Sequence, residues 1–558
     1  MKILGISLGH DTNFSLIDGG MVKSVSEAER FYRQKRYKLH CGTLDETDVE
    51  SGFQKVNTKE LKEYLTNIGN SWGFKYDGVA VQNQQRSAEY NNLITLLRDL
   101  GFEFEHCANI NHHLCHAASA YFTSPFSESL ILSYDGAGND GNTVFFSAKG
   151  NKIEYLNPLT IKFGGSYNNL GFIANLHADV SGSTAGKAMG LTSYGNFVER
   201  WADLLEMHIM RYEKKHPKQI VGLKSYGKAH SINWDYISQI PEVAKFISKD
   251  GSSLFNEKDV EAQDLLKTAQ TVWTKCVINL IKKHIGDYKN LCVVGGCALN
   301  GITNYEVQKS DLFSGMHMIP NPSDSGLSMG AGLYMHYSAF GNPFEGYGGY
   351  LSPYLGEEVF DKDKLPELKK KYNHKKLNDV EKELAGLICA DKIVGVVRGR
   401  YEIGPRALGN RSILCNSQNK NMRDVLNEKV KHREWFRPFA PVCTAEDAHK
   451  YFTNKNDIPY MSVICYTNNE HSENLPSVTH VDGSSRLQTV DSSQNSFLYK
   501  TLKEIEKING YPICVNTSFN PGGEPILNYY EVALQMLKDT DLDYVLIEDI
   551  LFWDKEFN

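Results

Sequence analysis

A repeated pattern of short apolar runs and tight turns constrains the fold of this chain more than any other feature. Residues 2–30, KILGISLGHDTNFSLIDGGMVKSVSEAER, contain three apolar runs separated by a polar Gly/His/Asp turn and then by a glycine turn. Residues 129–156, SLILSYDGAGNDGNTVFFSAKGNKIEYL, repeat this order, with an Asp-Gly turn in the first position. Such runs are typical of β-strands joined by hairpins. The sequence therefore predicts two copies of one three-stranded unit, with a chance similarity of two β-meanders as the alternative.

A long helix and a glycine turn are predicted after the second unit. Residues 262–285 have apolar side chains at helical spacing, and they lead into a buried strand, LCVVGG, and then into CALNGITNYEVQ, a predicted helix that begins after glycines. A strand, the Gly295-Gly296 pair and a helix N-terminus form a natural seat for phosphate or ribose. Together with the two units, this arrangement resembles the two halves of the actin and sugar-kinase fold, whose turns face each other across a nucleotide cleft.

The length of 558 residues predicts more than one domain. The turn-rich stretch 339–358, AFGNPFEGYGGYLSPYLGEE, is typical of a linker, and from about Lys362 predicted helices and strands alternate up to VLIEDILFW. We therefore expect two α/β domains, residues 1–355 and residues 360–558.

Composition narrows the class of protein. Lys+Arg 60 against Asp+Glu 67 gives a formal charge of -7, which argues against general binding to nucleic acids or membrane surfaces. The 11 cysteines are scattered without a CxxC pair, as expected for free thiols in a reducing cytosol. No apolar run approaches the ~18 residues of a membrane span, and the first residues turn polar too early for a signal peptide. We expect a cytoplasmic protein that binds neither nucleic acid nor membrane.

Basic residues gather between Gly399 and Pro441 although the chain is acidic overall. They alternate with glycines, prolines and aromatic residues in GRYEIGPRALGNRS and NEKVKHREWFRPFAP. Guanidinium groups match the paired oxygens of carboxylate and phosphate, and glycine lets the backbone come close to a ligand. The segment predicts an anion-binding site, with a solvated basic face as the alternative.

Two histidines and two aspartates predict a metal site. His112 and His116 are four residues apart in NHHLCHAASAY, so both imidazoles project from one face of a predicted helix, whereas His113 points elsewhere. Asp135 lies in the predicted turn SYDGAGND, and Asp324 lies in a glycine-rich loop, NPSDSGLSMGAG. Two His and two Asp residues are suited to Fe(II), Mn(II) or Zn(II), with open positions for a phosphate.

Several longer motifs carry a family resemblance over nearly the whole chain. They are HHLCHAASAY, YDGAG, GKAMGLTSYG, GGCALN, SDSGLSMGA, GPRALGNRS, KHREWFRPFAP, VTHVDGSSRLQTV and NTSFNPGGEPI. Their sequence and order resemble the O-carbamoyltransferase family of nodulation-factor and antibiotic biosynthesis. The chain departs from that family at Asn139, where many relatives carry an acidic residue, and at Lys35-Arg36, which leaves the acceptor open.

The resemblance implies a fold and an activity. An N-terminal actin-like (ASKHA) domain would be related to the tRNA threonylcarbamoyl-transferase fold, and a C-terminal α/β domain would be related to YrdC. The implied enzyme makes carbamoyl-adenylate from carbamoyl phosphate and ATP, with Mg2+, and transfers the carbamoyl group to a hydroxyl of a small natural-product or saccharide acceptor. The resemblance is also compatible with a homodimer.

The resemblance further implies roles for individual residues. In the C-terminal domain, carbamoyl phosphate and the adenylate would be bound by Arg406, Arg411, Lys431, Thr479, Arg486, Asn516 and Ser518. In the N-terminal domain, Lys187 would contact a phosphate or carbamoyl oxygen, and Gly295, Gly296 and Asn300 would line the nucleoside. The metal, with Fe(II) favoured over Mn(II) and Zn(II), would hold the adenylate phosphate.

His10, in the first predicted turn, is the candidate general base for the acceptor hydroxyl, and its neighbour Asp11 would orient it. A histidine that only hydrogen-bonds the turn is the alternative. For the whole protein, the alternative is an actin-fold small-molecule kinase or ATPase, which leaves the His112/His116 pair and the C-terminal arginines unexplained. The acceptor, the metal, the oligomeric state and the path of the adenylate between the two sites stay open.

Overall fold

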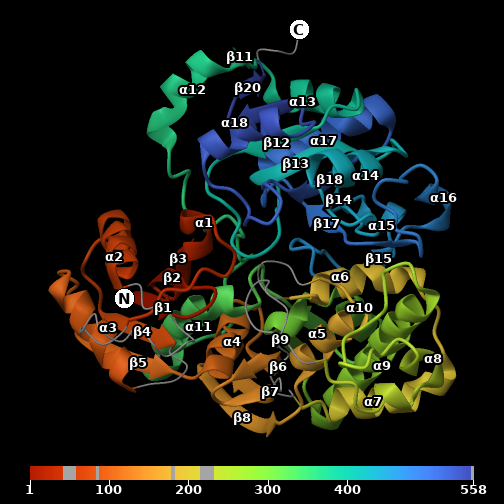
Figure 1. The fold of residues 1–558 in the computed structure, drawn as a ribbon. Helices are drawn as coiled ribbons and strands as arrows, with labels where there is room; N and C mark the ends of the chain where they lie inside the picture. The colour runs from red at the N-terminus through yellow and green to blue at the C-terminus, as the bar shows by residue number, and fades with distance from the viewer. Residues whose placement is uncertain (42–57, 83–86, 178–182, 214–231, 555–558) are drawn as a thin grey trace.

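Three large β-sheets organise the protein (Figure 1). The structure is a computed structural model that describes residues 1–41, 58–82, 87–177, 183–213 and 232–554. Within these residues, two sheets have five strands each and the third has eight, and β15 (Cys465–Tyr466) pairs with β16 (Ser484–Ser485) separately.

The two five-stranded sheets share one topology. In order across each sheet, the first contains β3 (Met21–Glu27), β2 (Asn13–Asp18), β1 (Lys2–Ser7), β4 (Gly78–Gln82) and β5 (His106–Ile110), and the second contains β8 (Lys152–Leu159), β7 (Gly141–Lys149), β6 (Glu128–Gly138), β9 (Asn290–Val294) and β10 (Gly315–His317). In each sheet the first three strands are antiparallel and the last two run parallel to the central strand. The predicted duplication is confirmed.

One detail of the prediction was wrong. Asp135 does not lie in a free turn, because β6 continues through it to Gly138. The pairing of β6 with β7 is regular up to Tyr134, is then interrupted, and resumes at Gly138 opposite Gly141. An irregularity of this kind re-aims side chains at the end of a strand, and Asp135 lies within it.

Two helices lie between the paired sheets, α4 (His112–Tyr121) and α11 (Leu327–Tyr334) (Figure 1). Their close approach depends on glycine. A Cβ atom on Gly330 of α11 would lie 1.8 Å from the Cys115 carbonyl oxygen of α4, and a Cβ atom on Gly5 of β1 would lie 2.0 Å from the Ser328 carbonyl oxygen of α11. Only residues without a side chain let these backbones come so near.

Helices also cover the outer faces of these sheets. The first sheet packs against α2 (Thr58–Trp72) and α3 (Ser87–Asp99). The second packs against α5 (Phe163–Ile173), α6 (Ala185–Leu191), α7 (Ala202–Met210) and α9 (Val260–His284), with α8 (Pro241–Ala244) and α10 (Gly301–Lys309) beside them. Buried Trp273 of α9 packs on Tyr134 of β6 at 5.9 Å between ring centroids. The predicted helix, buried strand and glycine-led helix after residue 261 are confirmed.

The eight-stranded sheet belongs to the C-terminal part. Its order is β11 (Asn373–Lys376), β20 (Ile550–Trp553), β19 (Tyr544–Ile547), β12 (Val394–Val397), β13 (Arg411–Asn416), β18 (Ile513–Ser518), β14 (Ala440–Thr444) and β17 (Gln488–Val490). Helices α13 (Val380–Cys389) and α17 (Ser496–Asn509) pack on one face, and α18 (Tyr530–Asp539) packs on the other. Shorter helices flank the sheet, α12 (Leu365–Lys371), α14 (Met422–Val425), α15 (Ala448–Tyr451) and α16 (Asn469–Ser472).

The predicted linker is confirmed as an irregular segment, because residues 340–361 contain neither helix nor strand. The division into residues 1–355 and 360–558 stays a prediction. None of the helices among the described residues combines the length and the apolar character that crossing a membrane requires.

A buried arginine joins the two parts of the chain. Arg30, on the short helix α1 (Ala28–Tyr32), is 1% exposed and donates hydrogen bonds to the carbonyl oxygens of Ile526 (2.9 Å) and Gly404 (2.7 Å). Its Nε group lies 3.2 Å from the Glu27 carboxylate, which in turn accepts a hydrogen bond from the Gly404 amide. The charge is thus both paired and hydrogen-bonded, the condition under which a buried ion pair is tolerated.

We expect Arg30→Met to lower the free energy of unfolding by about 3–5 kcal/mol, because it leaves the Glu27 charge buried without its partner. Chemical denaturation of the purified protein measures this change. Arg33→Met is the matched control, since Arg33 also pairs with the C-terminal part, through Glu524, but both side chains are partly exposed. Equal effects of the two substitutions would contradict the role given to Arg30.

Candidate functional site

The four predicted metal ligands lie together. His112 and His116 project from α4, Asp135 lies near the end of β6, and Asp324 begins the turn (Asp324–Gly326) that leads into α11. The His116 Nε2 atom is 3.1 Å from Asp135 Oδ2 and 3.4 Å from Asp324 Oδ1, and the His112 Nε2 atom is 3.8 Å and 3.7 Å from the same oxygens. All four donor atoms lie within 4.8 Å of one another.

This arrangement fits a divalent cation. The nitrogen–oxygen separations of 3.1 to 3.8 Å match those between neighbouring ligands of one ion whose bonds are about 2.1 Å long. Burial opposes a charge on His116, but hydrogen bonds and charges from Asp135 and Asp324 outweigh it and raise its pKa to about 9. The His116 Nδ1 atom is buried and has no hydrogen-bond partner among the described residues. Without an ion, the proton on His116 therefore offsets part of the negative charge of the two carboxylates, and a divalent cation can take its place.

The turn after β6 fixes the start of α4. The Asn139 side-chain oxygen accepts a hydrogen bond from the His112 amide at 2.9 Å. The Asp140 carboxylate accepts hydrogen bonds from the His113 amide at 2.8 Å and the Leu114 amide at 3.2 Å. These are amides of the first helical turn, which have no partner inside the helix. The turn that follows Asp135 thus caps the helix that carries the two histidines, a role that the sequence analysis missed.

His10 stands next to this cluster. Its Nδ1 atom is 3.0 Å from Asp11 Oδ2 and its Nε2 atom is 3.3 Å from Asp324 Oδ2, with 42% of the side chain exposed. The hydrogen bond with Asp11 is the largest influence on the imidazole, and with the charge of Asp324 it outweighs partial burial and raises the pKa of His10 to about 9. The structure therefore places an accessible imidazole, oriented by Asp11, beside the candidate metal site.

The glycine turn after β9 lies against the same cluster. Gly295 has a φ of 94°, and a Cβ atom on it would lie 2.2 Å from the Tyr134 carbonyl oxygen. A Cβ atom on Gly296 would lie 2.9 Å from Asp135 Oδ1. Asn300 accepts a hydrogen bond from the Thr303 amide at 3.1 Å and so caps α10. The glycines open space beside Asp135, and the nucleoside contacts of Gly295, Gly296 and Asn300 stay a prediction.

Basic side chains form a second cluster in the C-terminal part. Burial and the neighbouring charge of Arg437 lower the pKa of Arg406 to about 10, and the Arg406 Nε atom has no hydrogen-bond partner among the described residues. Burial and the charges of Arg406, Arg437 and Arg433 hold the pKa of Arg486 well below its usual range. Burial is the larger cause of both shifts, and the charges of neighbouring arginines add to it, so several positive groups lie close together, which is the electrostatic pattern of an anion site.

Lys431 is held at the edge of this basic cluster. Its ammonium group is buried and donates hydrogen bonds to the Ser518 carbonyl oxygen (2.8 Å) and to Asn520 Oδ1 (2.7 Å). Burial and the charges of Arg433 and Arg437 lower its pKa. Asn516 donates a hydrogen bond to the carbonyl oxygen of Ala407, the residue after Arg406, at 3.1 Å. Of the predicted anion-binding residues, Lys431 thus contacts Ser518 directly, and Asn516 contacts the residue that follows Arg406.

Other predicted residues have partners elsewhere. Arg411 is buried and donates hydrogen bonds to Asn528 Oδ1 at 2.8 Å and to the Gly399 carbonyl oxygen at 2.9 Å, contacts that stabilise the fold. The Thr479 hydroxyl lies 2.9 Å from the Thr467 hydroxyl. Lys187 of α6 forms an ion pair with Glu434, across the boundary between the two parts of the chain. The ligand contacts given to Arg411, Thr479 and Lys187 stay predictions.

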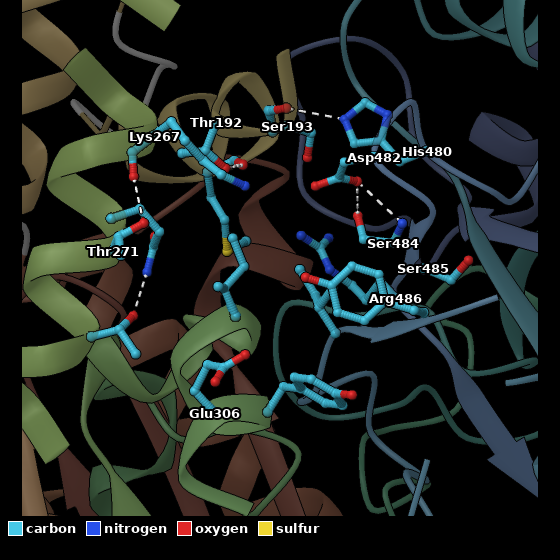
Figure 2. A pocket seen from close by; sticks show the side chains of 18 of the residues that line it. Thr192, Ser193, Lys267, Thr271, Glu306, His480, Asp482, Ser484, Ser485 and Arg486 are labelled. Carbon is cyan, nitrogen blue, oxygen red and sulfur yellow. Dashed lines mark hydrogen bonds between the residues drawn. The ribbon is translucent and has the colours of Figure 1, made fainter. Parts of the chain in front are cut away.

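A pocket of about 480 Å³ lies between the two parts of the chain (Figure 2). Lys267 and Thr271 of α9 stand on one side of it, and His480, Asp482 and Arg486 stand on the other. Arg486 is the one lining residue that was predicted from the sequence to bind a ligand. The lining residues come from residues 189–306 and residues 438–486, so no local motif could have revealed the pocket.

Comparisons with known proteins decide the family. The model of the carbamoyltransferase N-terminus matches residues 2–333, and the model of the carbamoyltransferase C-terminus matches residues 385–553. The chain belongs to the carbamoyltransferase family. Its enzymatic activity is therefore carbamoyl transfer.

Curated relatives of this carbamoyltransferase cover nearly all of its length. Nodulation protein NolNO of Sinorhizobium fredii is 30% identical over 97% of the chain and 78% of the relative. Nodulation protein U of the same organism is 26% identical over 94% of each chain. Among solved structures, full-length HypF in the phosphate- and nucleotide-bound form aligns with 15% identity and a TM-score of 0.33. The alignment covers 61% of this chain and 47% of that chain, and a similarity this low supports no conclusion about fold or function.

In the carbamoyltransferase we expect Asp140→Ala to lower the affinity for a divalent cation about tenfold, because capping contacts hold the ligand-bearing helix in place. Titration with Co(II) against a coloured chelator measures the affinity. Asp379→Ala is the matched control, since Asp379 caps α13 in the C-terminal part by accepting a hydrogen bond from the Lys382 amide at 3.2 Å. Wild-type affinity in Asp140→Ala would contradict the capping role.

We also expect His10 of the cation-free carbamoyltransferase to titrate near pH 9, and Asp11→Asn to bring its pKa back toward the ordinary value of 6.5. The folded-state pKa is raised, so the stability that this interaction adds is present at low pH and is lost as the pH rises through about 9. NMR of 13C-labelled histidine, assigned with His10→Gln, gives the titration curve. A wild-type pKa near 6.5 would refute the effect of Asp11.

Proposed function

We propose that the chain is an ATP-dependent O-carbamoyltransferase. It makes carbamoyl-adenylate from carbamoyl phosphate and ATP, with Mg2+, and transfers the carbamoyl group to a hydroxyl of a small natural-product or saccharide acceptor. The two like-ordered sheets support an actin-like (ASKHA) N-terminal domain, and the C-terminal α/β domain would be YrdC-like. The observation that carries the proposal is the cluster of buried guanidinium groups around Arg406 and Arg486, whose pKa values are lowered by burial and by the charges of neighbouring arginines.

The basic cluster suits the first step. Carbamoyl phosphate and ATP are both anions, and cationic groups have to offset their repulsion. Water cleaves carbamoyl phosphate to carbamate and inorganic phosphate, then a carbamate oxygen attacks the α-phosphorus of ATP and pyrophosphate leaves. Arg406, Arg486 and Lys431 would neutralise the charge of these groups, with Asn516 and Ser518 supplying hydrogen bonds.

His10 suits the second step. In its neutral form it takes the proton of the acceptor hydroxyl while the hydroxyl oxygen attacks the carbamoyl carbon and AMP leaves. Asp11, which favours the charged imidazole, then stabilises the proton that His10 has accepted. The residues that fit a divalent cation would be His112, His116, Asp135 and Asp324, with Fe(II) favoured over Mn(II) and Zn(II). When bound, such an ion stabilises negative charge on a leaving phosphate.

Release of pyrophosphate by the purified protein, given ATP and carbamoyl phosphate without acceptor, tests the first step. We expect release that requires both substrates and falls at least about 100-fold in Arg406→Ala, because a buried cation in a charged site contributes several kcal/mol to transition-state stabilisation. Arg200→Ala is the matched control, since Arg200 pairs with Glu242 on the surface.

Release of inorganic phosphate from ATP as ADP forms, independent of carbamoyl phosphate, would refute the proposal. That outcome would favour the alternative, an actin-fold small-molecule kinase or ATPase. The assay therefore separates adenylyl transfer from phosphoryl transfer, because only the former yields pyrophosphate.

A further inference from the structure

Arg406 lies in the basic cluster without a polar contact that holds its side chain. No hydrogen bond or ion pair of its guanidinium group is found among the described residues. A long side chain of this kind points to a ligand in a defined direction only from a fixed backbone, because ordering its rotamers costs conformational entropy. The contacts that fix the backbone on either side of Arg406 therefore determine whether the guanidinium group is available to an anion.

The backbone before Arg406 is fixed at Gly404. The Gly404 amide donates a hydrogen bond to Glu27 at 2.9 Å, and its carbonyl oxygen accepts one from Arg30 at 2.7 Å. Gly404 has a φ of 89°, and a Cβ atom on it would lie 2.3 Å from the Pro320 carbonyl oxygen. Only glycine fits this position, so the chain enters the segment that carries Arg406 along one path.

One buried carboxylate holds the backbone after Arg406. Glu402 is 0% exposed, and its Oε1 atom accepts hydrogen bonds from the amides of Leu408 (2.6 Å), Asn410 (3.0 Å) and Arg411 (3.1 Å). Its Oε2 atom has no hydrogen-bond partner among the described residues. Buried amides need an acceptor, and a single oxygen here serves three of them. The path of residues 404–411 therefore depends on the place of that oxygen.

The carbonyl groups of the same segment face amide side chains. The Ala407 carbonyl oxygen accepts a hydrogen bond from Asn516 at 3.1 Å, and the Leu408 carbonyl oxygen accepts one from Gln488 at 3.0 Å. Asn516 also donates to the Gln488 side-chain oxygen at 2.7 Å. Glu402 thus holds the amides of the segment, whereas Asn516, a predicted ligand-binding residue, and Gln488 hold its carbonyl groups.

We propose that Glu402 is a positioning residue for carbamoyl transfer. Its carboxylate shapes residues 404–411 so that the Arg406 side chain points to the anion, while Glu402 itself contacts no ligand. The inference rests on the proposed function, because that function gives Arg406 the task of binding carbamoyl phosphate. It assigns a role to the only acidic residue of the segment GRYEIGPRALGNRS. The place of the oxygen, rather than the negative charge, is what the segment requires.

Calorimetric titration with carbamoyl phosphate separates the place of the oxygen from the charge. Glu402→Gln keeps the length of the side chain and an oxygen for the three amides, whereas Glu402→Asp keeps the charge but withdraws the oxygen by one methylene group. We expect Glu402→Gln to stay within about threefold of the wild-type Kd and Glu402→Asp to raise the Kd about tenfold, because only the shorter side chain releases the amides.

The Arg406→Ala background supplies a readout that a purely structural role would not change. In it we expect Glu402→Asp to have no further effect on the Kd, because the effect of Glu402 runs through Arg406. Asp361→Ala is the matched control, since buried Asp361 also accepts hydrogen bonds from amides, those of Tyr530 (2.7 Å) and Glu531 (3.0 Å) at the start of α18. It should lower stability and leave the Kd for carbamoyl phosphate unchanged.

Two results would overturn the inference. One is a change of order, in which Glu402→Gln binds carbamoyl phosphate as weakly as Glu402→Asp or Glu402→Asp binds like the wild-type protein. The other is an equal loss from Glu402→Asp with and without Arg406. Circular dichroism shows that each variant is folded, and the prediction for Glu402→Gln holds by itself if Glu402→Asp is not. A wild-type protein that binds no carbamoyl phosphate would overturn the proposed function itself, which is a separate result.

Discussion

The close packing of α4 against α11 is the constraint on which the rest of the N-terminal part depends. Gly330 lets the two helix backbones approach, and it thereby brings the segment before α11 next to the histidines of α4. Asn13 of β2 fixes that segment, since it donates a hydrogen bond to the Asp324 carbonyl oxygen at 2.8 Å and accepts one from the Ser328 amide at 3.0 Å. The candidate metal site thus combines Asp135 of the second repeated unit with ligands on α4 and before α11, and Asn13 of the first unit holds the Asp324 segment in place.

Two clusters of opposite charge lie in this protein. The acidic groups Asp135 and Asp324 lie beside the His116 imidazole, whose positive charge offsets part of theirs. In the basic cluster, Glu434 pairs with Arg437, and the positive charges of the arginines around Arg486 outnumber it. Buried charges without partners destabilise a fold, so a protein keeps them where a ligand completes the site. The net charge of -7 hides this local excess of positive charge.

The sequence was sufficient for features that depend on local spacing. Strand alternation predicted the duplicated units, and the four-residue spacing of His112 and His116 predicted one helical face, because helix geometry fixes which side chains share a face. The sequence was insufficient for residue roles that depend on long-range contacts. Arg411 has the same charge as Arg406, but its guanidinium group donates hydrogen bonds to Asn528 and Gly399. Only the tertiary structure determines this difference. The capping role of Asp140 was harder to predict. An acidic residue near the start of a helix is a known signal, but the helix that Asp140 caps lies earlier in the sequence than Asp140 itself.

Contacts on the α1 side and on the α6 side join the two parts of the chain, and the pocket lies on the α6 side. Arg30 and Glu27 join the parts on the α1 side. On the α6 side, His480 Nε2 lies 3.1 Å from the Gly190 carbonyl oxygen, and Tyr194 meets Trp435 edge to face at 4.9 Å. Gly190 and His480 also line the pocket, so the contact between them both joins the two parts and shapes the pocket. A ligand that touches both walls must stabilise this boundary by the same free energy by which the boundary favours ligand binding, because the two equilibria are linked.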